Sequence, residues 1–264
     1  MDFSAPETIA AVAIAAVAGV VRGITGFGGA MVMAPPLALL FGPSLAVPVV
    51  LLLESVAATP MLVQTRRQVR WRVVGPILAA ACLAAPLGRY VLVVAEPQLL
   101  RRAIAAIVIV FSLLLLFGWR YAGRQRIATS IGLGALSGTM VGATSIGGPP
   151  VILYLLSGPD PVAVTRANLT LFVAATSLAA IAALWLGGIL GLPAVVAGLL
   201  LAPGYYGGLV AGSRAFARFH DVRFRRFTLL LLIVVSGTNR FMALRPTSRA
   251  RTSQIPSPPF CRWR

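Results

Sequence analysis

Apolar residues are arranged in eight long segments, which short polar connections separate. The segments lie near 8–42, 44–63, 73–95, 99–118, 127–157, 163–186, 192–212 and 224–239. Six of them have about the length that one membrane-spanning helix requires, roughly 20 residues. The first and the fifth are too long for one straight span and short for two. The pattern predicts an all-α integral membrane protein.

Both long segments contain a glycine-rich interruption. The first contains Gly23-Ile-Thr-Gly-Phe-Gly-Gly29, and the fifth contains Gly142-Ala-Thr-Ser-Ile-Gly-Gly148 directly before two prolines. Adjacent glycines destabilise a helix by about 1 kcal/mol each relative to alanine, and proline permits a fresh helix start. Backbone that leaves a helix inside a membrane must be buried in protein or line a cavity. We therefore predict discontinuous or re-entrant helices in both segments, either as shallow hairpins or as two short spans.

Landmarks recur in the same order in two halves of the chain. Ser55-Val-Ala-Ala-Thr59 has a counterpart in Phe172-Val-Ala-Ala-Thr176, and the long interrupted segment comes first in each half. We predict an internal duplication, with repeat 1 at 1–118 and repeat 2 at 119–237. Each repeat then consists of an interrupted block, 8–42 or 127–157, followed by three spans.

Composition supports a membrane protein without nucleic-acid or metal chemistry. Hydrophobic residues make up 58% of the chain and charged residues 11%, and the net charge is +17. The basic residues lie mainly between apolar segments, where they act as topology signals rather than as a nucleic-acid patch. No phosphate-binding loop and no cluster of metal ligands is visible, so we expect no cofactor and no enzymatic activity. The tail, 238–264, is basic and proline-rich, and we expect it to be disordered.

The arginines distinguish two topologies. If each interrupted block returns to its side of entry, the connections at 64–72, 119–126, 158–166 and 213–226 share one side, which then carries most of the arginines. The opposite connections carry only Arg101 and Arg102, partly offset by Glu96. If each block crosses once, arginine-rich connections face both sides, against the positive-inside bias. The first topology is favoured, and it predicts inverted repeats with the N-terminus outside.

Three of these motifs carry a resemblance to a known family. Gly26-Phe-Gly-Gly29, Arg70-Trp71-Arg72 and the stretch from Gly138 to Pro150 resemble the TauE/SafE family of sulfite exporters and related anion permeases. The resemblance covers roughly residues 9–237. It implies a carrier of sulfite, sulfonates or related organic anions in the bacterial inner membrane, without indicating which anion. The tail departs from the family pattern, and so does the second interruption, where Ser145-Ile-Gly-Gly-Pro-Pro150 replaces a plain glycine run.

The interruptions and the few intramembrane polar residues form the candidate anion site. Broken helices expose N–H groups that attract anions, hydroxyls add donors, and charges inside a membrane are costly enough to indicate function. The candidate substrate-binding residues are Arg22, Thr25, Gly26, Gly28, Gly29, Thr144, Ser145, Gly147, Gly148, Arg166 and Asn168. Glu54 is the candidate for proton coupling, provided that burial raises its pKa.

Several of these residues also have a structural interpretation. Arg22 and Glu54 are equally suited to a fixed ion pair, and Arg166 to a connection that orients the protein. The spacing of Gly19 with Gly23, and the similar spacing in Gly134, Gly138 and Gly142, is also typical of close helix packing.

Together these features predict a secondary transporter of a small anion that works by alternating access. An anion channel with the same pore-lining residues is the alternative. The expected partners are a small anionic substrate and the lipid bilayer, with a homo-oligomer left open and no nucleic acid.

Overall fold

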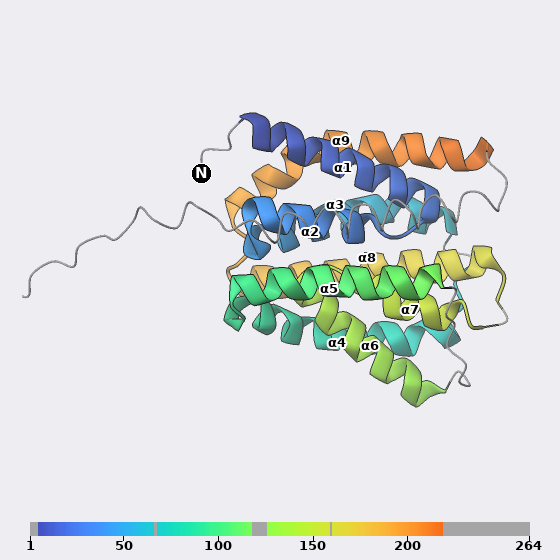
Figure 1. The fold of residues 1–264 in the computed structure, drawn as a ribbon. Helices are drawn as coiled ribbons and strands as arrows, with labels where there is room; N and C mark the ends of the chain where they lie inside the picture. The colour runs from blue at the N-terminus through green and yellow to red at the C-terminus, as the bar shows by residue number, and fades with distance from the viewer. Residues whose placement is uncertain (1–4, 66–67, 118–125, 159, 219–264) are drawn as a thin grey trace, which may run out of the picture.

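A computed structural model describes residues 5–65, 68–117, 126–158 and 160–218 (Figure 1). These residues form nine helices and no strands. The helices are α1 (Ala5–Thr25), α2 (Gly29–Phe41), α3 (Pro43–Thr65), α4 (Trp71–Val94), α5 (Pro97–Leu116), α6 (Ile127–Thr144), α7 (Gly148–Leu155), α8 (Val162–Leu186) and α9 (Leu192–Arg218). The helical prediction is therefore confirmed for the described part of the chain.

The helices coincide with the first seven apolar segments. Each interrupted segment forms two helices, α1 with α2 and α6 with α7, and the other five form one helix each. Within the described residues, six helices are long and apolar enough to cross a membrane: α1, α4, α5, α6, α8 and α9. The eighth segment, 224–239, and the tail, 238–264, lie outside the described residues.

Each interrupted segment consists of a helix of spanning length followed by a shorter helix. α1 has 21 residues and α2 has 13, while α6 has 18 and α7 has 8. At a rise of about 1.5 Å per residue, α7 is roughly 12 Å long and cannot cross a membrane alone. In Figure 1, α2 and α7 run in the direction opposite to α1 and α6, the long helices that precede them.

The helix ends separate into two groups in Figure 1. The C-terminal ends of α3, α5, α7 and α9 lie at one end of the bundle, and the starts of α1, α5 and α9 lie at the other. The first group is flanked by described arginines at positions 70, 72, 126 and 214, so we call it the arginine-rich end. This is the topology that the arginine distribution favours, because both interrupted segments return to the end from which they entered.

Glycines bring α1 against α9. An added Cβ at Gly19 or Gly23 would overlap backbone atoms of Tyr205 or Leu209, and one at Gly208 would overlap the Ala16 carbonyl. Because the two backbones are in contact, no side chain fits between α1 and α9 at these positions.

A second pair, α4 and α6, is built in the same way. An added Cβ at Gly134 or Gly138 would overlap the carbonyls of Ile77 or Ala81, and one at Gly142 would overlap the Ala85 carbonyl. The packing interpretation of these glycines therefore agrees with the structure on both helices. In each pair, a helix that ends at an interruption lies against a helix from the other half of the chain.

Candidate functional site

The first interruption is a tight turn that glycines make possible. α1 ends at Thr25, and the backbone then takes positive φ angles at Gly26 (79°) and Gly28 (88°) before α2 begins. Glycine adopts such angles without the steric cost that a Cβ brings. The Thr25 hydroxyl donates to the Val21 carbonyl (2.8 Å) and accepts from the Phe27 N–H (3.2 Å), which closes the end of α1.

The second interruption has the same local geometry. The Thr144 hydroxyl donates to the Met140 carbonyl (2.7 Å) and accepts from the Ile146 N–H (3.3 Å). Ser145 then takes a positive φ of 60° in the place that Gly26 holds in the first turn. A residue with a Cβ costs about 1–2 kcal/mol in this conformation. The two turns thus share a threonine and a left-handed residue directly after it.

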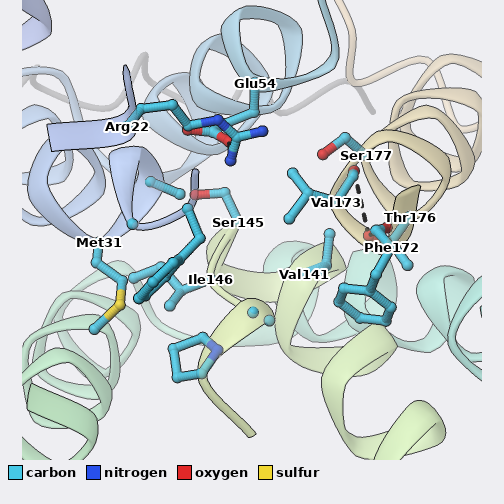
Figure 2. A pocket seen from close by; sticks show the side chains of 16 residues that line it. Arg22, Met31, Glu54, Val141, Ser145, Ile146, Phe172, Val173, Thr176 and Ser177 are labelled. Carbon is cyan, nitrogen blue, oxygen red and sulfur yellow. Dashed lines mark hydrogen bonds and ion pairs between the residues drawn. The ribbon is translucent and has the colours of Figure 1, made fainter. Parts of the chain in front are cut away.

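A cavity lies between the two turns (Figure 2). Its volume is about 30 Å³, above the roughly 10–15 Å³ that one water molecule requires. Residues from both interruptions and from α3 and α8 form its wall. The lining residues are Arg22, Phe27, Gly28, Ala30, Met31, Glu54, Val141, Ser145, Ile146, Gly147, Gly148, Pro149, Phe172, Val173, Thr176 and Ser177.

Arg22 and Glu54 form a buried ion pair at the cavity wall. Arg22 Nη1 contacts Glu54 Oε2, and Figure 2 shows the two side chains together, above Ser145. The Tyr205 hydroxyl on α9 donates to Glu54 Oε1 at 2.7 Å. The exposed fractions are 1% for Arg22, 2% for Glu54 and 0% for Tyr205. A charge with so little access to water must be paired to be tolerated, so this network joins α1, α3 and α9.

The ion pair does not use all of the Arg22 donors. Nε and Nη2 are buried and have no hydrogen-bond partner among the described residues. The great majority of buried donors in proteins are paired, and each unpaired donor costs about 1–3 kcal/mol. Arg22 lines the cavity, and a guanidinium whose Nε and Nη2 are both unpaired can donate two parallel hydrogen bonds to one oxyanion.

Glycines at the interruptions also make space for this network. An added Cβ at Gly29 would overlap Glu54 Oε1 and would lie 2.7 Å from the Tyr205 hydroxyl. An added Cβ at Gly147 would overlap Val141 and the Ser137 carbonyl. Gly148 differs, because an added Cβ there meets no atom within 4 Å. Gly29 and Gly147 are therefore required by close contacts at positions where the φ angle alone would not demand glycine.

The structure gathers most of the predicted site residues around this cavity. Arg22, Gly28, Glu54, Ser145, Gly147 and Gly148 line it, and Thr25, Gly26, Gly29 and Thr144 form the adjoining turns. Asn168 lies outside the cavity lining, and its Oδ1 accepts a hydrogen bond from the Arg70 N–H (2.9 Å) before α4. Arg166 lies on α8, and its side chain is outside the described part of the structure.

Sequence reasoning missed three polar residues of this region. Tyr205 follows Glu54 by 151 residues, and Ser177 and Thr176 lie at the middle of α8. The signal for Tyr205 is a phenol inside an apolar segment, where its hydroxyl needs a partner. Nothing in the sequence indicates that this partner is Glu54, because the pair depends on how α3 and α9 pack.

The six helices of spanning length define a multi-pass membrane protein. The family described as Sulfite exporter TauE/SafE matches residues 11–238. This is most of the chain, which therefore belongs to that family of membrane transporters. No curated protein and no solved structure matches the chain.

Proposed function

We propose that this protein is a secondary transporter of a small anion, such as sulfite or a sulfonate, in the bacterial inner membrane. The observation that carries the proposal is the pair of unpartnered, buried Arg22 donors at a cavity between the two interruptions. The arginine-rich end then faces the cytoplasm, in line with the positive-inside rule.

Several groups around the cavity suit an oxyanion. Ser177 is buried on α8 and lines the cavity, so its hydroxyl is a candidate donor to a bound anion. The N-terminal ends of α2 and α7 lie beside it, since Gly28, Ala30, Gly147 and Gly148 belong to its wall. The first N–H groups of a helix carry partial positive charge and have no partner within the helix. An anion here interacts with the Arg22 guanidinium of α1 and with the helix dipoles of α2 and α7, one from each half.

Alternating access is the mechanism that this arrangement favours. The two interruptions share a local geometry, and each helix that precedes one packs against a helix of the other half, α1 with α9 and α6 with α4. An inverted duplication accounts for both observations, because it exchanges these two pairs. In such a protein the two halves move about a fixed central site and open it to one side at a time.

An anion channel with the same lining residues is the alternative. It would require a continuous pore, whereas the cavity in this conformation is small. Single-channel currents from the reconstituted protein would support the channel, and turnover that saturates with substrate supports the carrier.

The function is tested with purified full-length protein in liposomes. Uptake of radiolabelled sulfite and methanesulfonate is measured for the wild type, for Arg22→Gln and for a control variant, Arg102→Gln. Arg102 is exposed near the start of α5, at the end of the bundle opposite the arginine-rich end. We expect saturable uptake of at least one anion by the wild type and by Arg102→Gln, and a loss of about 10-fold or more in Arg22→Gln. Equal uptake by all three proteins would remove the proposed site, and no uptake of either anion by the wild type would contradict the proposed substrate class.

A further inference from the structure

The cavity wall holds one cation and one anion, and these two charges already cancel. Arg22 pairs with Glu54, and no other charged residue lines the cavity in the described structure. A substrate anion that joins them adds a second negative charge to a site with one positive charge. In a buried site of low dielectric constant, an uncompensated charge is strongly disfavoured.

We infer that the site takes up a monovalent oxyanion only together with one proton, which binds to Glu54. This inference rests on the proposed transport function and specifies its coupling. With the proton bound, the three groups are a guanidinium, a neutral carboxyl and an anion, so the charges cancel again. The protonated carboxyl no longer competes with the substrate for the guanidinium.

Glu54 is the only carboxylate at the cavity among the described residues, so it is the group that takes this proton. The titratable groups that face it within the described residues are Arg22 from α1 and Tyr205 and Tyr206 from α9. Tyr206 donates its hydroxyl to the Leu53 carbonyl (3.4 Å), next to Glu54 in the chain. α2 and α6, which pack against α3, contain no titratable residue. α8 also packs against α3, and the residues with which it lines the cavity are Phe172, Val173, Thr176 and Ser177, none of them titratable.

The geometry provides a simple exchange at Arg22. The substrate first accepts hydrogen bonds from the unpartnered Nε and Nη2, which lie on the same guanidinium as the Nη1 that contacts Glu54. A proton from the water that enters the cavity then binds to Glu54 Oε2, and Nη1 becomes available to the substrate. The Tyr205 hydroxyl remains on Oε1 at 2.7 Å and keeps the carboxyl in place through the exchange. Tyr205 is thus a positioning residue.

This coupling has a measurable consequence for the energetics of transport. One proton and one monovalent anion cross together, so the complex carries no net charge from the substrate into the membrane. Transport should then follow the proton gradient and ignore the membrane potential. A tenfold proton gradient supports accumulation of the anion by about tenfold, because each anion brings one proton with it.

The test uses full-length protein in liposomes with radiolabelled methanesulfonate, which is monovalent over the whole pH range used. Uptake is recorded under a proton gradient without potential and under a potential without proton gradient, and a pH dye outside the liposomes counts the protons taken up. We expect one proton per anion and no response to the potential. Uptake that the potential drives without proton movement would overturn the coupling and leave the transport function intact, whereas no uptake by the wild type under either condition would overturn both.

Variants then assign the proton to Glu54. In Glu54→Gln, the carboxamide oxygen can still accept the hydrogen bond from Tyr205, but the side chain cannot take up a proton. Proton movement should therefore disappear, and any remaining uptake should respond to the membrane potential. Glu96→Gln, the same change at an exposed position at the opposite end, should leave the stoichiometry at one. Tyr205→Phe should shift the pH profile of uptake and keep the stoichiometry at one. Unchanged proton coupling in Glu54→Gln would contradict the assignment, and the wild-type stoichiometry remains a test if that variant fails to fold.

Discussion

Gly29, the first residue of α2, lies directly against the Glu54 carboxylate. An added Cβ would overlap Glu54 Oε1 and crowd the Tyr205 hydroxyl, which donates to the same oxygen. The glycine therefore sets the position of the carboxylate and, through the ion pair, that of the Arg22 guanidinium. One missing side chain controls the geometry of three buried polar groups.

Gly29→Ala should reduce transport while leaving the protein folded. The atoms that the new methyl group would overlap are side-chain ends, which can shift, so the cost falls on the arrangement of the ion pair. A displacement of about 1 Å at a binding site lowers rates by up to roughly 100-fold, and we expect a loss of about tenfold or more in liposome uptake. The matched control is Gly132→Ala on α6, where an added Cβ meets no atom within 4 Å. Equal loss in both variants would contradict the role of Gly29.

The Arg22–Glu54 pair should behave as a unit in stability measurements. Arg22→Met leaves a buried carboxylate without its cation, and we expect a loss of about 3–5 kcal/mol. Combining it with Glu54→Gln removes the uncompensated charge, so the double variant should recover most of that loss. Thermal denaturation in detergent measures the recovery, and uptake should be abolished in both proteins. A double variant that is as unstable as the single one would show that the two charges are not coupled.

Adjacent glycines on α9 should differ sharply in their tolerance of alanine. At Gly208 an added Cβ would overlap the Ala16 carbonyl of α1, whereas at Gly207 it meets no atom within 4 Å. We expect Gly208→Ala to lower the free energy of unfolding by about 1–3 kcal/mol, as overpacking does. Gly207→Ala should be neutral or slightly stabilising, because alanine favours the helix. The comparison is made by thermal denaturation, and similar melting temperatures would argue against the close α1–α9 contact.

Ser177→Ala should weaken substrate binding without affecting the fold. Ser177 is a buried residue that lines the cavity, and the change to alanine removes one hydroxyl and leaves the helix backbone unchanged. A hydrogen bond to a bound anion is worth about 1.5–3 kcal/mol, and we expect KM for uptake to rise roughly tenfold or more. Ser213→Ala is the control, since that hydroxyl is exposed and donates to the Val210 carbonyl (2.9 Å). An unchanged KM in Ser177→Ala would place the anion away from α8.

The orientation can be tested with single cysteines in a background without Cys82 and Cys261. A membrane-impermeant maleimide added to intact cells should label cysteine at Gln98 or Leu192. Cysteine at Gln68 or Ile127, at the arginine-rich end, should react only after the membrane is broken. The reverse pattern would place the arginine-rich end outside.

Local features of this fold were predictable from the sequence, and contacts between distant segments were not. The glycine runs predict both interruptions because they act on the backbone where they stand, and the arginines predict the return of each block. Arg22 and Glu54 were each visible as rare charges in apolar segments. Their pairing was one of two open interpretations, and the structure shows that pairing leaves Nε and Nη2 unused.

The remaining differences arise from helix packing. Tyr205 reaches Glu54 only because glycines bring α9 against α1 beside α3. Asn168 follows the second interruption closely in sequence, yet it faces the start of α4 and binds the Arg70 N–H. On α8, Asn168 binds the segment before α4, whereas residues from Phe172 onward line the cavity. The sequence alone does not reveal which of these environments a residue of the helix meets.

The two glycine-packed helix pairs, α4 with α6 and α1 with α9, become available at different times during synthesis. α6 can pack against α4 soon after it enters the membrane, since only α5 separates them in the chain. α1 is made first but has to wait for α9, the last described helix, before its glycine face is covered. Until α9 is in place, Glu54, which pairs with Arg22, lacks the hydrogen bond from the Tyr205 hydroxyl. The glycine face of α1 also remains uncovered by α9. The packing of α1 is therefore completed only after α9 has been synthesised, so the first helix of the chain is among the last to reach its final contacts.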